Sequence, residues 1–249
     1  MPSTLFRAAE RGHTKIDWLE SYHTFSFGDY YAPENRGHGP LRVINDDRVK
    51  PASGFQTHGH QDMEILSIVL SGQLAHKDSM GNGSIIHPGD VQRMSAGTGV
   101  THSEFNPSET EAVHFLQIWI KPHSKGLPPS YEQTHFALGE TPNQWRLIAS
   151  ADGQDGAVTI HQTVNVWMCH LNDVRLPGDN LPVLFPPSLN KDKTDTPSGW
   201  LHVAQGEAGI NEAGLLEAGD GGLFAQERLQ VTQTKANTLL VWFDLSLHI

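Results

Sequence analysis

Cysteine, long apolar runs and clustered basic residues are all scarce in this 249-residue sequence. Cys169 is the single cysteine, so no disulfide framework can form within the chain, and we expect a small core residue there. No apolar run approaches the roughly 20 residues needed to cross a bilayer. Lys and Arg number 17 against 28 Asp and Glu, and they are scattered, which argues against nucleic-acid or membrane partners.

The opening residues, MPSTLFRAAERGH, lack the apolar core of a signal peptide. We therefore expect a cytoplasmic protein. We also expect a monomer. A hydrophobic content of 37% is sufficient for a buried core, so the chain is expected to be globular.

Short apolar runs recur between turn residues at spacings of about 8 to 12 residues, a pattern typical of β-sandwiches and barrels. Long helical stripes are rare. The pattern predicts an all-β fold with strands at 41–46, 64–70, 90–96, 112–120, 201–206 and 238–245.

A weak internal repeat predicts two similar halves. VLSGQLAH followed by IIHPGDVQRM resembles HVAQGEAG followed by LLEAGDGGLF, which pairs Gly72 with Gly206 and Gly89-Asp90 with Gly219-Asp220. The segment 121–133 is rich in proline and polar residues and is the best linker candidate. We accordingly predict domains at 1–132 and 133–249.

Two pairs of polar residues stand out in the first half. His58 and His60 are separated by one residue, as are His102 and Glu104. Residues i and i+2 of a strand project from the same face, about 6.6 Å apart along the strand. If the two strands are neighbours, three imidazoles and one carboxylate converge and leave open positions on a six-coordinate metal.

Glu64 is a rival for the carboxylate, because it also lies at an even offset from His60. Four strand residues span about 13 Å, however, which favours Glu104. The alternative to a metal site is that His58, His60 and His102 are ordinary polar residues of a half-buried sheet. Without partners, each would cost roughly 1 to 3 kcal/mol, whereas a metal satisfies all of them. We do not expect the other histidines, including His76, to be ligands, because we identify no paired carboxylates at strand spacing for them.

Longer stretches of the sequence carry a family resemblance: RGHTKIDWLESYHTFSFGDYY, LRVINDD, GFQTHGHQDMEILSIVLSG, HKDSMGN, MSAGTGVTHSEFNPS and QIWIKP. The two histidine blocks resemble the two cupin motifs, and the chain resembles pirin-family bicupins, close to bacterial pirin-like proteins with quercetinase activity. The resemblance implies two jelly-roll domains that face each other. It also implies metal ligands at His58, His60, His102 and Glu104.

The second half departs from this ligand pattern. Offsets taken from Gly72 and Gly89 and applied to Gly206 and Gly219 lead to Asp192, Thr194, Thr232 and Thr234, with no histidine among them. We therefore expect a C-terminal cupin domain without metal ligands.

Three nitrogens and one oxygen suit Fe(II), Mn, Co, Ni, Cu or Zn better than Ca or Mg. The resemblance implies one such ion per chain, with iron in the pirins. It further implies that O₂ opens the central ring of a quercetin-like flavonol and that carbon monoxide is released, with Glu104 as the catalytic proton acceptor.

A flat substrate needs an apolar slot. Candidates to line it are Phe25, Phe27, Phe55 and Met94, with His38 at its mouth. Two alternatives remain open: a non-enzymatic, iron-dependent regulatory protein of the pirin type, and a cupin that uses its metal only structurally.

Overall fold

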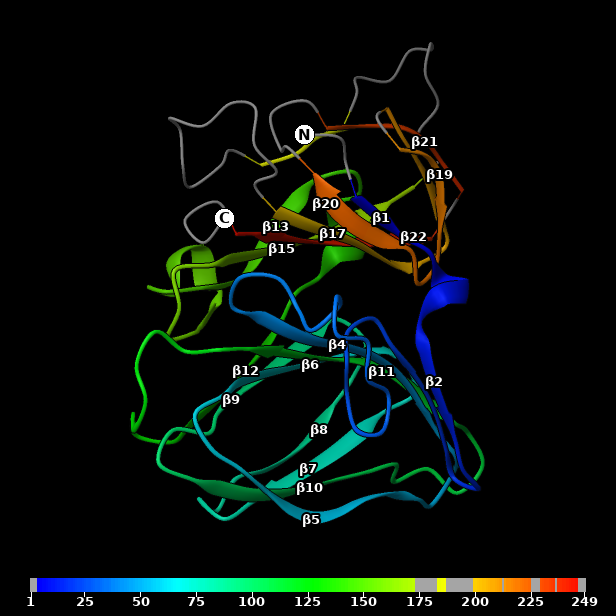
Figure 1. Ribbon diagram of the computed structural model, residues 1–249. Helices are drawn as coiled ribbons and strands as arrows, with labels where there is room; N and C mark the ends of the chain where they lie inside the picture. Colours follow the sequence, from blue (N-terminus) through cyan, green and yellow to red (C-terminus); the bar gives the residue numbers. More distant parts are fainter. Residues whose placement is uncertain are drawn as a thin grey trace. The chain divides into compact units, whose positions relative to one another are not determined.

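The computed structural model describes residues 4–172, 183–186, 199–211, 213–224, 229–235 and 237–245. Within these residues the regular structure consists of β-strands and three short 3₁₀ segments, Ala8–Glu10, Leu138–Glu140 and Gln154–Gly156 (Figure 1). No helix in these ranges is long and apolar enough to cross a membrane. The all-β prediction is confirmed.

The N-terminal unit, residues 11–136 with 151–162, is a sandwich of two antiparallel sheets that appear as separate layers in Figure 1. Its larger sheet has the order β12 (Ser130–His135), β9 (Asp90–Ser95), β6 (Glu64–Ser71), β11 (Val113–Ile120), β4 (Leu41–Val49), β3 (Leu19–His23) and β2 (Gly12–Lys15). The smaller sheet has the order β5 (Gly54–His60), β10 (Val100–Phe105), β7 (Leu74–Asp78) and β8 (Gly83–Ile86). The short strand β14 (Val158–Thr159) contacts β9 and β12.

The C-terminal unit, residues 1–10, 137–150 and 163–249, repeats this arrangement. Six strands of its larger sheet have the order β1 (Thr4–Phe6), β20 (Gly221–Phe224), β17 (Gly199–Gln205), β22 (Thr238–Asp244), β15 (Asn165–Leu171) and β13 (Trp145–Ser150). The smaller sheet has the order β16 (Val183–Leu184), β21 (Gln230–Thr234), β18 (Glu207–Ile210) and β19 (Gly214–Glu217).

The glycine turns of the predicted internal repeat have matching geometry. Gly72 and Gly206 both have φ +75°, and a Cβ at Gly72 would lie 2.7 Å from a backbone oxygen. In the next turn, the Asp90 carboxylate accepts from the backbone N–H three residues earlier at 2.9 Å, and the Asp220 carboxylate does the same at 3.1 Å. The two halves therefore share both sheet order and turn chemistry, which confirms the repeat.

Each unit has its own apolar core. In the N-terminal unit the core lies between the two sheets and includes Leu19, Val49, Val69, Leu74, Ile86, Val113 and Phe115. In the C-terminal unit Cys169 is fully buried in the core, and burial raises the pKa of its thiol to about 12. The thiol thus stays protonated at neutral pH, as expected for a core residue.

All six predicted strands form, with ends within three residues of those predicted. The linker predicted at 121–133 overlaps a strand, because Ser130–His135 form β12 and pair with β9. The predicted domain boundary between residues 132 and 133 falls within β12, and the division 1–132 and 133–249 stays a prediction.

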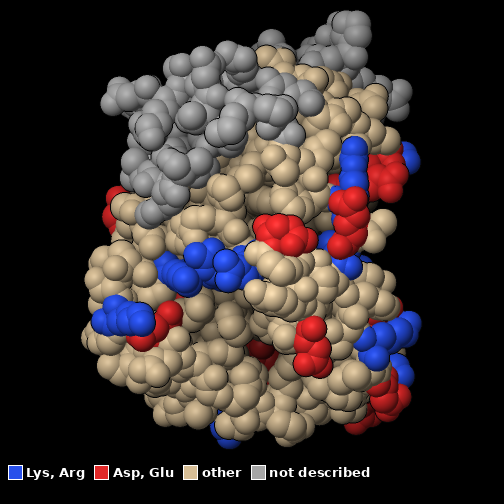
Figure 2. Space-filling view, in the orientation of Figure 1, with Lys and Arg blue, Asp and Glu red and all other residues tan. Residues whose placement is uncertain are grey.

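Charged side chains of both signs are interspersed on the face shown in Figure 2. Small groups of Lys and Arg lie among Asp and Glu, and most of this face is formed by other residues. On this face neither sign of charge is concentrated in a single large patch.

Candidate metal centre

The candidate ligands lie on two neighbouring antiparallel strands of the smaller N-terminal sheet. In β5 and β10, His58 is directly opposite His102, and the register then shifts so that Glu104 is opposite Phe55. One extra residue of β5 in this interval forms a β-bulge, a feature that re-aims side chains. A Cβ at Gly54 would lie 2.2 Å from the backbone oxygen of Glu104, so glycine is needed where the two strands approach beside the bulge.

Three imidazoles converge at this place. The ring centroids of His58, His60 and His102 are 4.5 to 4.8 Å apart, and one nitrogen from each lies within 4.8 Å of the others. His58 Nε2 is 3.0 Å from His102 Nε2. A separation of about 3.0 Å is that of two nitrogens which each lie about 2.1 Å from one ion at a right angle.

The hydrogen bonds around these rings leave nitrogen lone pairs free at the centre. His58 Nδ1 is 2.7 Å from the backbone carbonyl of Gln56, which can only accept, so Nδ1 carries the hydrogen and Nε2 is bare. His60 Nε2 is buried and has no hydrogen-bond partner in the described part of the chain. An unpaired buried polar atom is costly, and a cation at this point would satisfy the lone pair of this nitrogen.

Burial keeps two of the three imidazoles neutral. Desolvation lowers the pKa of His60 to about 4, with a further contribution from the nearby His102 and His58 rings. Desolvation likewise lowers the pKa of His102 to about 3, with contributions from His58 and His76. Neutral imidazole is the form that binds a metal, so these two rings are ready to ligate at neutral pH.

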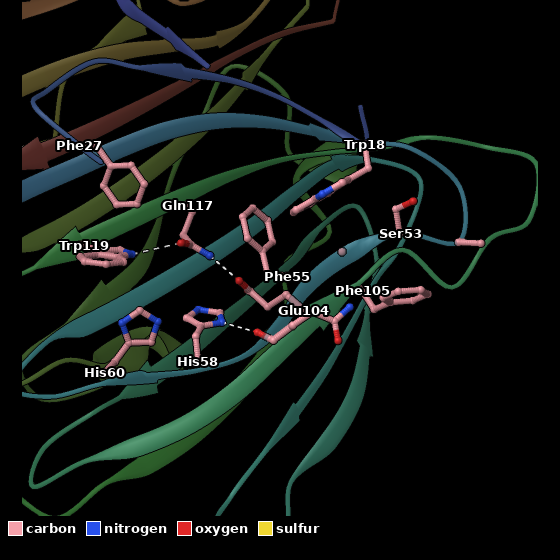
Figure 3. Close-up of a pocket in the computed structure, with 13 residues that line it drawn as sticks. Trp18, Phe27, Ser53, Phe55, His58, His60, Glu104, Phe105, Gln117 and Trp119 are labelled. Atoms are coloured by element: carbon pink, nitrogen blue, oxygen red, sulfur yellow. Dashed lines mark hydrogen bonds between the residues drawn. The ribbon is translucent and has the colours of Figure 1, made fainter. Parts of the chain in front are cut away.

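Glu104 is held by side chains of the opposing sheet. Its Oε1 accepts from the Ser67 hydroxyl at 3.2 Å and its Oε2 accepts from the Gln117 amide at 2.6 Å. The Trp119 indole N–H in turn donates to Gln117 Oε1 at 3.2 Å, so Trp119, Gln117 and Glu104 form a chain (Figure 3). A Glu104 oxygen lies within 4.8 Å of ligand nitrogens of His76 and His102.

Glu64, the rival carboxylate, takes part in a different network. Its Oε2 accepts from Ser95 Oγ at 2.7 Å, and its Oε1 lies 3.2 Å from His161 Nδ1. Neither candidate metal-binding group found among the described residues includes it. Its partners place Glu64 in a buried polar cluster formed with the segment 151–162.

Sequence reasoning missed the pair formed by His76 and Asp78. His76 Nε2 is 3.2 Å from Asp78 Oδ2, and both side chains are fully buried. His76 Nδ1 is 3.5 Å from His102 Nδ1. The signal was visible in the sequence, because His76 and Asp78 have the same one-residue separation as the pair His102 and Glu104.

A cavity of about 730 Å³ opens onto the imidazoles of His58 and His60 (Figure 3). It is lined by Trp18, Phe27, Ala52, Ser53, Gly54, Phe55, Gln56, His58, His60, Glu104, Phe105, Gln117 and Trp119. Phe27 and Phe55 are thus where the sequence suggested.

Phe25, Met94 and His38 do not line the cavity. Phe25 and Met94 are buried core residues, and His38 forms an isolated bridge with Leu41. The lining residues Trp18, Gln117 and Trp119 were not foreseen, because they come from strands and turns far from the histidine motifs in sequence.

The corresponding positions of the C-terminal unit differ. Thr232 and Thr234 lie on β21, the counterpart of β10, where hydroxyls replace His102 and Glu104. Asp192 and Thr194 lie outside the described residues.

Solved structures similar to this chain define the class of fold. The crystal structure of YhhW from Escherichia coli has a TM-score of 0.83 and 38% identity, and covers 98% of this chain and 97% of its own. A structure of the bacterial pirin YhhW in complex with nickel(II), also from Escherichia coli, has a TM-score of 0.82 and covers 98% of both chains. The predicted bicupin fold, with two jelly-roll units, is confirmed.

Sequence relatives give the family. A protein-family model described as Pirin matches residues 6–120. A protein of Pasteurella multocida, provisionally named as a quercetin 2,3-dioxygenase, is 42% identical over 240 residues, which are 96% of this chain and 97% of the relative. The quercetin 2,3-dioxygenase of Escherichia coli strain K12 is 48% identical over 163 residues, which are 66% of this chain and 69% of the relative. The chain belongs to the pirin family.

Proposed function

We propose that this protein is a metal-dependent dioxygenase that opens the central ring of quercetin-like flavonols with O₂. One observation carries the proposal: three imidazole nitrogens lie within 4.8 Å of one another, and two of the three residues, His58 and His60, line an aromatic cavity of about 730 Å³. That volume lies in the range of pockets that enclose small-molecule ligands, roughly 300 to 1,000 Å³. The names of the relatives from Pasteurella multocida and Escherichia coli support the reaction class.

The metal in this proposal is held by His58, His60 and His102, with Glu104 as the fourth ligand. The free Nε2 atoms and the buried, unpaired His60 Nε2 support the three histidines. Glu104 is supported by its position two residues after His102, its approach to the His102 ring and its place in the cavity wall. A nitrogen-rich donor set favours a transition metal, and we propose Fe(II) as the native ion, with Mn, Co, Ni, Cu or Zn as substitutes.

A bound divalent ion would supply Lewis acidity that favours the deprotonated form of the flavonol 3-hydroxyl. The chain's own carboxylate, Glu104, takes up that proton, because it faces the cavity and is otherwise buried. Gln117 and Ser67 fix its oxygens by hydrogen bonds from the opposing sheet. These contacts orient the acceptor before the substrate arrives.

The aromatic walls position the flat substrate and exclude water. Phe55 packs edge-on against Trp18, with ring centroids 5.0 Å apart, and Phe27 packs edge-on against Trp119 at 5.4 Å. These two pairs leave an apolar slot beside the histidines. In the overall reaction the flavonol loses C3 with its oxygen as carbon monoxide, and both atoms of O₂ enter the ring-opened ester, so no external reductant is needed.

The test is turnover of quercetin by protein loaded separately with Fe(II), Ni(II) and Co(II). We expect O₂ uptake and carbon monoxide release in equal amounts, both abolished by His60→Ala, while His135→Ala on the same unit retains activity. Binding of quercetin without turnover for every metal would contradict the enzymatic proposal and favour a non-enzymatic pirin.

A further inference from the structure

Asp78 accepts four hydrogen bonds inside the N-terminal sandwich. Its Oδ1 accepts from the backbone N–H of Met80 at 2.9 Å and of Asn82 at 3.0 Å. Its Oδ2 lies 2.9 Å from Asn82 Nδ2 and 3.2 Å from His76 Nε2. A carboxylate surrounded by donors is ionised and acts only as an acceptor, so His76 Nε2 carries a hydrogen.

The position of the hydrogen on His76 determines which nitrogen of His102, the candidate metal ligand, carries its own hydrogen. In the imidazole tautomer with its hydrogen on Nε2, His76 has a bare Nδ1, which lies 3.5 Å from His102 Nδ1. Two bare nitrogens would repel each other, so the hydrogen of His102 belongs on Nδ1, where it points at His76. His102 Nε2 is then the nitrogen with the free lone pair, and it faces the bare His58 Nε2 at 3.0 Å, an arrangement that a cation bound to both nitrogens would stabilise.

We propose that Asp78 and His76 are a positioning pair that fixes the tautomer and ring orientation of His102, so that His102 Nε2 is presented to the metal. The inference rests on the metal centre of the proposed function and deepens it. Residues that hydrogen-bond the second nitrogen of a ligating histidine fix its tautomer and raise its basicity, and their loss usually costs about 10- to 100-fold in metal affinity.

The surroundings of His76 hold its ring in place. Both nitrogens face partners on β7 and β10, and its side chain is fully buried. One face of the ring stacks on Tyr131, with centroids 5.1 Å apart and an interplanar angle of 30°. Tyr131 is itself anchored through its hydroxyl, which donates to Gln133 Oε1 at 2.9 Å.

A competing reading makes His76 a ligand, since nitrogens of His76 and His102 and an oxygen of Glu104 also lie within 4.8 Å of one another. That reading requires the hydrogen of His102 to leave Nδ1, the nitrogen nearest His76. It also leaves the cluster formed by His58, His60 and His102 without a metal ion. The two readings predict different results for variants of His76.

The test measures Ni(II) affinity by competition with a chelator in wild type, His76→Phe, Asp78→Asn and His60→Ala. His114→Phe is the matched control, because His114 also pairs with a buried carboxylate, Asp46 Oδ1 at 2.7 Å, but on β11 of the other sheet. We expect about 10- to 100-fold weaker binding for His76→Phe and Asp78→Asn, no measurable binding for His60→Ala and no change for His114→Phe.

A second readout is the ¹⁵N spectrum of the histidine rings in Zn(II)-loaded protein, where the ion satisfies the facing lone pairs and the spectrum reports the tautomer directly. We expect the hydrogen of His102 on Nδ1 in wild type, and a mixture of tautomers in Asp78→Asn. A wild-type His102 with its hydrogen on Nε2 would overturn the proposal even if His76→Phe failed to fold.

The affinity results separate this inference from the proposed function. Unchanged affinity in both pair variants would overturn the positioning role and leave the metal centre intact. Complete loss of binding in a folded His76→Phe, as in His60→Ala, would make His76 a ligand and would equally overturn it. Failure of the wild type to bind any Ni(II) would instead contradict the metal centre itself.

Discussion

His58 Nε2 lies 3.0 Å from His102 Nε2, and the two residues are directly opposite each other on β5 and β10. His58 directs its Nδ1 hydrogen to the Gln56 carbonyl, so its Nε2 lone pair points at the second ring. Burial lowers the pKa of His102 to about 3, so a proton is not taken up between the rings at neutral pH. We propose a divalent cation as the partner that stabilises this arrangement.

Acid should release the metal only at low pH. A proton displaces the ion by binding an imidazole of the folded protein, and burial lowers the pKa of His60 to about 4 and of His102 to about 3. Lowered values mean that more acid is needed, so we expect Ni(II) to be retained from pH 7.5 to 5 and lost as the pH falls from about 4 to 3. Metal content after gel filtration at each pH measures this, and complete release by pH 6 would contradict it.

Asp47→Asn should stabilise the metal-free protein more at neutral than at acid pH. Burial raises the pKa of Asp47 to about 7, with Glu104 and Asp46 adding to the effect, against an unfolded value of about 3.9. Between these values the unfolded chain has released the proton and the folded chain retains it, so wild-type stability falls as the pH rises through this window and is constant above it.

A pKa difference of about 3 corresponds to about 4 kcal/mol. We therefore expect the unfolding free energy of Asp47→Asn to rise relative to wild type by a few kcal/mol, on the order of that figure, between pH 4 and 7. Urea titrations in the presence of a chelator measure it. Asp17→Asn is the control, because the Asp17 side chain is 99% exposed. Parallel pH profiles for Asp47→Asn and wild type would refute the prediction.

Gln117→Leu should impair turnover by releasing Glu104, the proposed catalytic carboxylate. The substitution removes the 2.6 Å hydrogen bond to Glu104 Oε2 and leaves a buried oxygen without this donor. We expect kcat for quercetin to fall by about 10- to 100-fold at saturating metal. Gln133→Leu, which removes a similar amide bond to Asp90 on β9, is the control and should leave kcat unchanged. Equal kcat values for the two variants would exclude a role for Gln117.

Phe55→Ala should weaken substrate binding without loss of the metal. If the flavonol covers about 50 Å² of the Phe55 ring, at about 25 cal/mol per Å², its removal raises KM about tenfold. Steady-state kinetics and metal content together check this result. Tyr31→Ala removes an exposed aromatic ring that does not line the cavity, and should leave KM unchanged. A KM shift of equal size in both variants would show that the cavity is not the binding site.

The strands and the candidate ligands could be predicted because both follow from local alternation. EILSIVL is buried throughout, as expected for a strand between two neighbours, and His58, His60 and His102 meet because i and i+2 share a face. Asp78 was overlooked although it follows the same spacing, because a histidine and carboxylate in sequence do not reveal whether the strand lies beside β10.

Contacts between the two sheets could not be predicted. Gln117 reaches Glu104 only because β11 faces β10 across the sandwich, a relationship set by the packing of the sheets. The β-bulge that pairs Glu104 with Phe55 is likewise a register shift that the sequence does not show. The prediction that Phe25 and Met94 line the cavity was wrong, because hydrophobicity alone does not distinguish a core residue from a pocket residue.

The most direct test of the metal centre is anomalous diffraction at the nickel edge from crystals of the Ni(II)-loaded protein. We expect one peak in the N-terminal unit, about 2.0 to 2.2 Å from His58 Nε2, His60 Nε2, His102 Nε2 and a Glu104 oxygen. A peak centred on His76, or loaded crystals in which the three imidazoles surround no peak, would contradict it.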